Sequence, residues 1–271
     1  MMTWVNGVSV WSLFLLLYIT VSYSLDLSAF GNLHIPDVNS DHNSIHGGVK
    51  MGVLDDTCDN GKDRIDVDLS MMSEMTRKCP PSNRLPVPTC KLWRRDKFSL
   101  KSVSCKTPEP ICTKRAHRPI HQCMDKVIVY KDDIPTSGAH RPIWPVYGEY
   151  DYLPPQRWIH SLEHGAAVFL YHPCVDHRQL DVFRSLATSC LRRHIITPYN
   201  LTQDKPFAIL TWTCRMMLDR VDIHIPAAVD FLRDKALQTY ESNVYQDGDY
   251  KFLLKKIAKT VTDKQDYVVC P

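Results

Sequence analysis

The chain has 271 residues, a formal net charge of +3 and 44% hydrophobic residues. This is the composition of an ordinary globular protein, and it excludes a wholly disordered chain. With only 10 glycines and 18 prolines, the chain is not collagen and is not built mainly from Gly-rich linkers or from a nucleotide-binding fold with glycine-rich loops. The charge is too small to argue for nucleic-acid binding.

The first 24 residues predict a secretory signal. They contain no Lys, Arg, Asp or Glu, and residues 10–21 form an apolar run of 12 residues, too short to span a bilayer as a helix. The small residues Ser22 and Ser24 fit cleavage after Ser24. An uncleaved signal anchor is the alternative, because no basic residue precedes the run. No later segment is apolar for 18 residues, so we expect an extracellular or lumenal chain with no transmembrane segment after cleavage.

The cysteines are expected to form disulfides. There are 10 of them, an even number in an oxidising compartment. No Cys-x-x-C occurs, which argues against a thioredoxin-like redox site and a zinc ribbon. The sequence leaves the pairing open among Cys58, Cys79, Cys90, Cys105, Cys112, Cys123, Cys174, Cys190, Cys214 and Cys270.

One N-glycosylation sequon is present, Asn200-Leu201-Thr202. It follows Pro198 in a predicted surface loop, so we expect an N-glycan on Asn200.

Composition divides the chain into five parts. They are a signal peptide (1–24), an acidic and largely irregular arm (25–79), a basic Pro/Cys-rich segment (80–131), an α+β core (132–245) and a C-terminal helix with a tail (246–271). The arm has ten acidic and five basic residues, and its His34, His42 and His46 are interpreted as solvated side chains or as a metal-binding tract. Residues 84–131 carry twelve basic and three acidic residues, which indicates a solvated basic face or a weak contact with polyanions.

The predicted elements follow in chain order. Residues 126–130 and 166–171 are predicted strands; Asp176 caps a helix that runs to about Arg193; and residues 207–218 form another strand. A further helix begins at about Pro226, with Val229, Leu232, Ala236, Leu237 and Tyr240 facing inward. Residues 251–264 read as an amphipathic helix, and Cys270 would pin the chain end to the body. The predicted fold is α+β, a small sheet with helices packed on one face, preceded by the disulfide-stapled region.

Residues 135–174 carry the candidate chemistry. They contain four histidines, and His160 and His164 would share one side of a helical turn, with His140 arriving from a separate loop. Convergent imidazoles suit Zn or Cu. Glu163 is interpreted as a ligand, an orienting group or a base. The structural alternative is that Glu163 pairs with Arg157 or Arg141 and that the histidines make ordinary buried hydrogen bonds.

Two catalytic interpretations are weaker. Residues 160–164 fit the H-x-x-E-H pattern of inverse zincins, but that motif needs a long helix, and prolines precede it while Gly165 ends it. Ser137 and Ser161 lack a G-x-S-x-G nucleophile elbow.

These same motifs resemble a known family. Residues 135–140 (PTSGAH), 147–150 (YGEY) and 158–165 (WIHSLEHG) resemble a bacterial and animal domain family of unknown function. Residues 169–174 (FLYHPC), 200–206 (NLTQDKP) and 210–212 (LTW) are similar to its animal branch, the p53-inducible protein 13-like proteins. The resemblance covers roughly residues 125–240 and implies at most a growth-restraining role. Vertebrate members resemble single-pass membrane proteins, whereas no such C-terminal segment is expected here.

The sequence therefore predicts a secreted, disulfide-bonded protein that binds Zn or Cu through His140, His160, His164 and Glu163. The alternatives are a non-catalytic extracellular interaction module with structural histidines and an unknown protein partner, and, more remotely, a metal-dependent hydrolase. A metal site requires ring nitrogens that converge on one centre, whereas structural histidines each end on a separate carbonyl or carboxylate.

Overall fold

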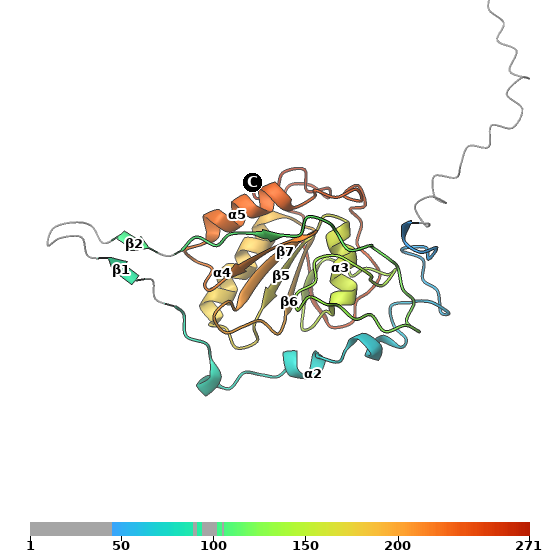
Figure 1. Cartoon of the computed structure of the whole chain (residues 1–271), viewed down its shortest axis with the longest axis horizontal. Helices are drawn as coiled ribbons and strands as arrows, with labels where there is room; N and C mark the ends of the chain where they lie inside the picture. The colour runs from blue at the N-terminus through green and yellow to red at the C-terminus, as the bar shows by residue number, and fades with distance from the viewer. Residues whose placement is uncertain (1–44, 89–90, 94–101, 105) are drawn as a thin grey trace, which may run out of the picture. The chain divides into compact units, whose positions relative to one another are not determined.

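A mixed sheet lies at the centre of the fold (Figure 1). The computed structural model describes residues 45–88, 91–93, 102–104 and 106–271, all within the unit Val38–Pro271. The seven strands lie in the order β3-β8-β7-β5-β6-β4-β9. They are β3 (Ile111–Cys112), β4 (Gly148–Tyr150), β5 (Ala167–Tyr171), β6 (His194–Pro198), β7 (Phe207–Thr211), β8 (Cys214–Leu218) and β9 (Leu254–Ile257). The β5–β6 and β6–β4 pairs are parallel, and the others are antiparallel.

The other elements surround this sheet or precede it in the chain. The strands β1 (Lys91–Trp93) and β2 (Ser102–Ser104) form a separate antiparallel pair. The helices are α2 (Met72–Met75), α3 (Pro155–Glu163), α4 (His177–Cys190) and α5 (Ile225–Lys235), with 3₁₀ turns η2 (Ile65–Asp68) and η3 (Pro81–Asn83). The α+β class is thereby confirmed.

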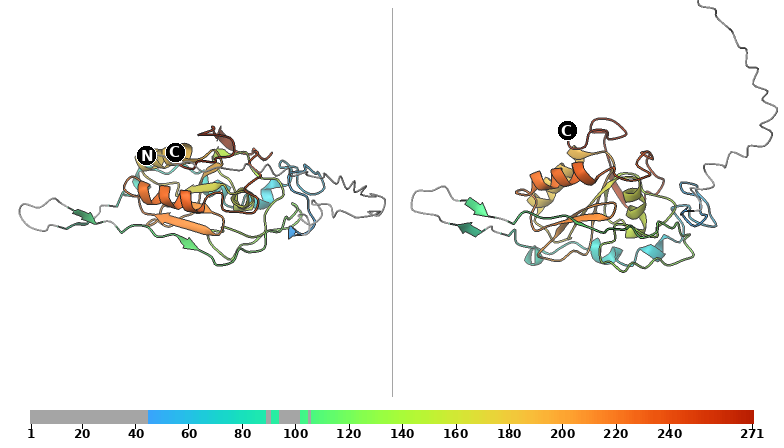
Figure 2. Two further views of the ribbon diagram at one scale, coloured as in Figure 1. Left: turned by 90° about the horizontal axis from the view of Figure 1, so that it is seen from above. Right: turned by 45° about the horizontal axis from the view of Figure 1, so that its top comes forward.

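Helices cover both faces of the sheet (Figures 1 and 2). On one face, Phe183 of α4 and Phe231 of α5 share a core cluster with Phe169 of β5. On the other, Trp158 of α3 shares a cluster with Val168 of β5. Successive side chains of a strand point to opposite faces, so β5 is buried on both and reads as a continuous apolar run. The predicted packing on one face is correct for α4 and α5, the two helices that were predicted correctly. Helix α3 packs on the opposite face.

The strongest sequence patterns gave the correct elements. The strand predicted at residues 166–171 is β5, and the Asp176 carboxylate accepts hydrogen bonds from Arg178 N and Gln179 N at 3.0 and 3.2 Å, capping α4 as expected. The strand predicted over residues 207–218 is a hairpin of β7 and β8, because Thr213 adopts φ 64° and turns the chain.

The helix near Pro226 is confirmed as α5, but it ends at Lys235. Leu232 is buried as expected. Tyr240, predicted to face inward, lies beyond the helix and is fully exposed, so that part of the prediction is wrong.

Two predicted elements are absent. Residues 251–264 form no helix: Leu253 has φ 60°, which a helix cannot contain, and the chain continues as the edge strand β9, with Ile257 exposed. Residues 126–130 are not a strand, because they join no ladder. The strand β6, which the sequence did not predict, pairs with both β5 and β4.

Residues 45–79 have little regular structure, yet they contribute to the interior. His46, Asp59, Asp68 and Met75 are all buried. This segment is therefore held by specific side-chain contacts rather than by backbone ladders.

Disulfides join distant parts of the chain, and eight of the predicted cysteines are paired. The pairs are Cys58–Cys123, Cys79–Cys174, Cys112–Cys214 and Cys190–Cys270. The last confirms that Cys270 pins the chain end to α4. These four disulfides among the described residues indicate an oxidising compartment. Cys90, Cys105, His34, His42 and the predicted signal peptide lie outside the described residues.

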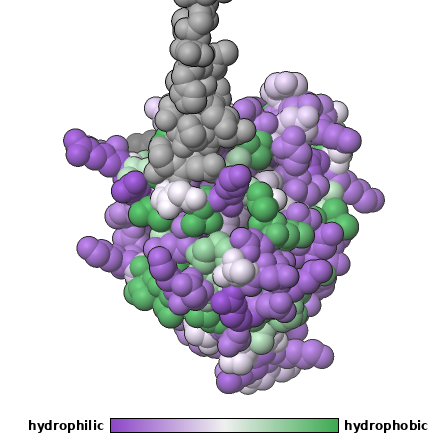
Figure 3. Space-filling model, turned by 90° about the vertical axis from the view of Figure 1, so that its right-hand side faces the viewer, coloured by the Kyte–Doolittle hydropathy of each residue, from purple (hydrophilic) through white to green (hydrophobic). Residues whose placement is uncertain are grey.

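The face drawn in Figure 3 mixes hydrophilic side chains with separate hydrophobic ones and presents no single continuous apolar surface. Within the described ranges, none of the helices has the length and apolar character needed to cross a membrane.

Candidate metal centre

Helix α3 carries the central part of the site. Trp158 and Leu162 pack toward the sheet, so His160 and Glu163 lie on the opposite side of the helix. The helix stops at Glu163 because Gly165 has φ +81°, and a Cβ there would lie 2.8 Å from the Cα of Leu237. This tight turn places α3 directly before β5.

His140 comes from the PTSG turn and lies beside His121. The two residues form an isolated parallel bridge, in which His140 N donates to Ile120 O and Gln122 N donates to His140 O, both at 2.9 Å. The imidazole Nδ1 of His140 donates to Gly138 O at 2.8 Å. The turn thus orients the ring that follows it.

Three imidazoles are oriented in the same way. Nδ1 lies 2.9 Å from Val49 O in His121, 2.8 Å from Gly138 O in His140 and 2.7 Å from Arg141 O in His160. A carbonyl oxygen only accepts, so each Nδ1 carries the proton and each neutral ring keeps a lone pair on Nε2.

The three rings also lie close to one another. One ring nitrogen from each of His121, His140 and His160 lies within 4.8 Å of the other two, and Nδ1 is already committed in all three. None of the three Nε2 atoms makes a hydrogen bond with the described residues, and the three side chains are 0–3% exposed. Buried nitrogens of this kind require a partner such as a water molecule or an ion.

Carboxylates flank this centre. The Oε2 atom of Glu163 lies 3.2 Å from His140 Nε2. Glu163 also forms a second possible ligand group with His121 and His46, whose ring stacks on His121 with centroids 4.4 Å apart. Both nitrogens of His46 already have partners, Pro119 O at 2.7 Å and Glu241 Oε1 at 2.9 Å. The group of His121, His140 and His160 is therefore the better prepared to bind an ion.

His164 is directed elsewhere. Its Nε2 lies 3.1 Å from Glu241 Oε2, and its ring meets Trp144 edge to face at 4.7 Å. The structure therefore brings His140 and His160 together with Glu163 nearby, and places His164 with Glu241 instead.

His121 was not among the predicted site residues, and His46 of the arm was interpreted as a solvated side chain or as part of a metal-binding tract. No motif surrounds either residue. The one local signal is Cys123, two residues after His121, whose disulfide to Cys58 fixes that segment on the core.

Two buried ion pairs hold the loops around the histidines. The guanidinium of Arg141 donates to both carboxylate oxygens of Asp68, at 2.8 and 2.6 Å. That of Arg157 donates to both oxygens of Asp59, at 2.6 and 3.0 Å. These aspartates are the partners of the two arginines, so neither guanidinium pairs with Glu163. Because Arg141 O accepts from His160, its ion pair also positions that ring.

Burial sets the charge state of the three rings. It lowers the pKa of His121 to about 3 and of His140 to about 4, and it lowers the pKa of His160 well below its usual value. The three rings are therefore neutral at physiological pH, which is the form that binds a metal.

Glu241 and His46, which lie beside the three rings, are instead shifted toward their charged forms. Burial opposes ionisation of Glu241, but hydrogen bonds from His164 and His46 outweigh it and lower the pKa of the carboxyl. Burial likewise opposes the charged form of His46, but the hydrogen bond to Glu241 raises the pKa of the ring. A carboxylate–imidazole pair thus lies next to three neutral imidazoles.

The other predicted residues lie apart from this cluster. His172 is half-buried, and its Nδ1 accepts a hydrogen bond from Cys174 N at 3.0 Å. Asn200 is exposed just after β6.

Residues 121–248, which contain His121, His140, His160 and Glu163, match the family model described as "Protein of unknown function (DUF3105)". This agrees with the expected likeness to a domain family of unknown function. No curated protein and no solved structure matches the chain.

Proposed function

We propose that the protein binds one transition-metal ion, Zn or Cu, through the Nε2 atoms of His121, His140 and His160. The observation that carries this proposal is that three buried rings, each with its Nδ1–H held by a backbone carbonyl, place one ring nitrogen each within 4.8 Å of one another. Fixing the second nitrogen of each ring in this way is typical of metal-ligating histidine. Three imidazoles are a ligand set that both zinc and copper accept.

Glu163 is the proposed fourth ligand. With the His140 proton on Nδ1, Nε2 and the Glu163 carboxylate oxygen are two acceptors facing each other at 3.2 Å. A cation between them would be bound by both atoms. Ligand atoms of a tetrahedral zinc site lie about 3.3 Å apart, so this pair has nearly the required separation, and small ring movements would bring in the other two.

The burial of the site favours a closed, protein-only coordination sphere over hydrolysis. A substrate has no contact with side chains that are 0–3% exposed. The H-x-x-E-H interpretation also loses support, because His160 groups with His121 and His140, whereas His164 lies beside Glu241. A bound ion would act here as a cross-link between the segments that contain His121, His140 and His160.

The second candidate is an extracellular interaction module in which the histidines are structural. The separate carbonyl partner of each Nδ1 favours it. It gives no account of three neighbouring buried Nε2 atoms that make no hydrogen bond with the described residues, so the metal-binding proposal explains more of the geometry.

We further propose that the chain belongs to the animal, p53-inducible protein 13-like branch of its family and acts in the secretory pathway or outside the cell. The disulfides and the exposed sequon at Asn200 support the compartment. Secretion of the full chain from cultured animal cells, followed by N-terminal sequencing, tests this. A mature N-terminus at Leu25 is expected, and retention in the cytosol would contradict it.

The metal proposal is tested on the secreted full chain by elemental mass spectrometry. We expect about one Zn or Cu per chain in the wild type and a loss of at least about tenfold in His160→Ala and His121→Ala, because each removes one of three ligands. The matched control is His194→Ala: His194 is also buried, and its Nδ1 lies 2.7 Å from Leu191 O, but it lies outside the cluster. This control should keep its metal.

Folding of each variant is checked by mapping the four disulfides. A wild type that is folded, correctly paired and free of metal would refute the proposal and leave the interaction module.

A further inference from the structure

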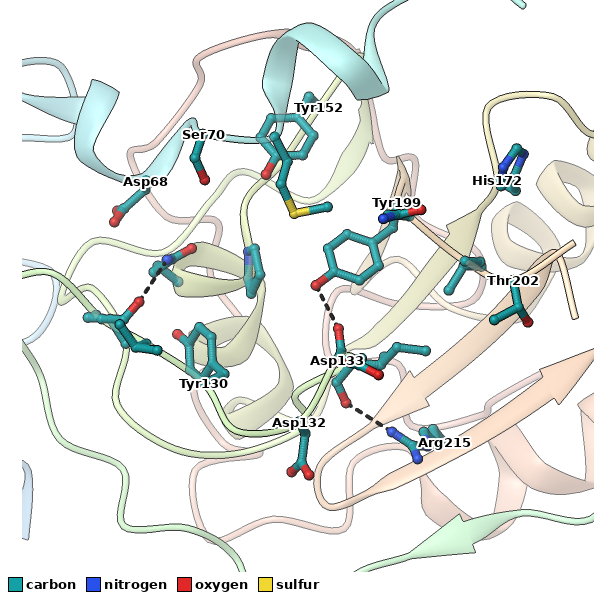
Figure 4. A pocket seen from close by; sticks show the side chains of 18 of the residues that line it. Asp68, Ser70, Tyr130, Asp132, Asp133, Tyr152, His172, Tyr199, Thr202 and Arg215 are labelled. Carbon is teal, nitrogen blue, oxygen red and sulfur yellow. Dashed lines mark hydrogen bonds between the residues drawn. The ribbon is translucent and has the colours of Figure 1, made fainter.

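A cleft of about 970 Å³ lies apart from the histidine cluster, and none of the cluster histidines lines it (Figure 4). Its lining comes from segments far apart in the sequence, among them the end of η2 with Ser70, the loop with Asp132 and Asp133, and the loop that follows β6 with Tyr199 and Thr202. The hydroxyl of Tyr199 donates to Asp133 O at 2.7 Å and ties two of these segments together.

Three apolar side chains that line the cleft are exposed to water. Ile111, Val127 and Val129 are 55%, 68% and 84% exposed, and all three line the cleft. Residues 127–130 join no ladder, so no neighbouring strand covers them. Clustered apolar side chains of this kind mark a surface that something else covers.

The same cleft offers many polar groups. The exposed side chains of Ser70, Asp132, Asp133, Thr202 and Gln203 also line it. Hydroxyl, carboxylate and amide groups beside apolar surface match the two kinds of surface that a sugar ring presents, its hydroxyl groups and its C–H faces.

Asn200, the acceptor of the sequon, is itself part of the lining. Its side chain is exposed, whereas Tyr199 and Leu201 on either side are 6% and 4% exposed. The backbone is fixed there as well, because Tyr199 N donates to Tyr171 O at 2.9 Å. A sugar attached to Asn200 therefore begins at the wall of the cleft on a rigid loop.

We propose that Asn200 carries an N-glycan whose first sugars lie in this cleft and cover its apolar rim. The bond forms between Asn200 Nδ2 and the anomeric carbon of the first sugar of a lipid-diphosphate-linked oligosaccharide. The bond from that carbon to the diphosphate oxygen breaks, the diphosphate leaves with the electron pair, and the amide gives up one proton. Tethering at the wall gives the sugar a high effective concentration in the cleft, which a free ligand would lack.

The test compares two forms of the full chain secreted from animal cells: wild type and Asn200→Gln. Mass spectrometry should find the glycan on Asn200, and hydrogen exchange should be at least about fivefold slower at residues 127–134 in the glycosylated protein. Trimming the glycan to its first sugar should preserve this protection. An unmodified Asn200, or equal exchange in the two forms, would overturn the proposal.

A matched pair of variants tests whether the sugars lie in the cleft or are only attached to Asn200. Val127→Ser with Val129→Ser removes the apolar rim and should abolish the protection while the glycan stays attached. Val53→Ser with Leu54→Ser removes two side chains that are each 52% exposed and do not line the cleft, and it should leave the protection intact. Equal protection in all glycosylated forms would overturn the seating of the sugars.

Discussion

At the scale of single residues, the distinctive feature is a group of imidazoles kept neutral inside the protein. In the unfolded chain His121 and His140 take up protons near pH 6.5, whereas in the folded protein burial lowers their pKa values to about 3 and about 4. Between these values the unfolded state binds more protons, so the free energy of unfolding falls as the pH is lowered. His46 opposes this, since its raised pKa adds stability at low pH.

We therefore expect metal-free protein to lose at least about 2 kcal/mol of unfolding free energy between pH 6.5 and pH 4, because several buried rings must stay uncharged. Denaturant titrations at a series of pH values measure it. His140→Asn should reduce the pH dependence, and His177→Asn, which alters an exposed histidine, should not. A wild-type stability independent of pH over this range would contradict the expectation.

The sequence predicted part of this site because part of it is local. His160 and Glu163 lie three residues apart on one helix, and His140 adjoins a recognisable turn. His121 and His46 could not be found in this way, since a parallel bridge and a stacking contact bring them in from segments without periodicity. The partner of His164 could not be predicted either, because Glu241 is far away in the chain.

At the scale of elements, the junction between α3 and β5 fixes the direction of the helix that carries the site. Gly165 combines a positive φ with a backbone contact to Leu237, whereas Gly48 has a similar φ, +85°, with nothing within 4 Å of its Cβ position. A substitution at Gly48 therefore measures the cost of the backbone conformation alone, whereas one at Gly165 adds the cost of a steric clash.

Gly48→Ala should cost about 1 kcal/mol, the usual penalty for a left-handed non-glycine residue. Gly165→Ala should cost at least about 1 kcal/mol more, since Leu237 must also move. Chemical denaturation of both variants checks this, and equal costs would show that the junction accommodates a methyl group.

Elements with strong internal patterns were predicted correctly, and those defined by their neighbours were not. β5 is a continuous apolar run, and α4 has a capping aspartate and an apolar stripe. β9 is a strand because it pairs with β4 at the sheet edge. The spacing of its apolar residues matches that of an amphipathic helix, but Ile257, expected to face inward, is exposed. Pairing with a distant strand outweighed the local pattern in this case.

At the scale of the whole molecule, disulfides hold irregular segments on the core. Cys58–Cys123 lies next to the site, since Cys123 closely follows His121 and Asp59 is paired with Arg157. Cys112–Cys214 instead joins β3 to β8.

Replacing either pair with alanine should cost about 4 kcal/mol, because the loops closed are of similar length, with separations of 65 and 102 residues. Of the two variants, we expect Cys58→Ala, Cys123→Ala to lose metal as well, since Cys123 lies two residues after His121 and its disulfide holds that segment on the core. Metal content measured alongside stability distinguishes the two, and metal lost equally from both variants would contradict the assignment.

The buried ion pairs have a consequence for how this fold can be divided. Arg141, Arg157 and Arg193 all lie within the family match at residues 121–248, but their carboxylate partners, Asp68, Asp59 and Asp266, all lie outside it. A fragment cut at the family boundaries would keep the four proposed ligands and strand three guanidinium groups, each at a cost of several kcal/mol. We therefore expect that the region matching the family model does not fold alone, because the flanking segments supply the carboxylates that neutralise its buried arginines.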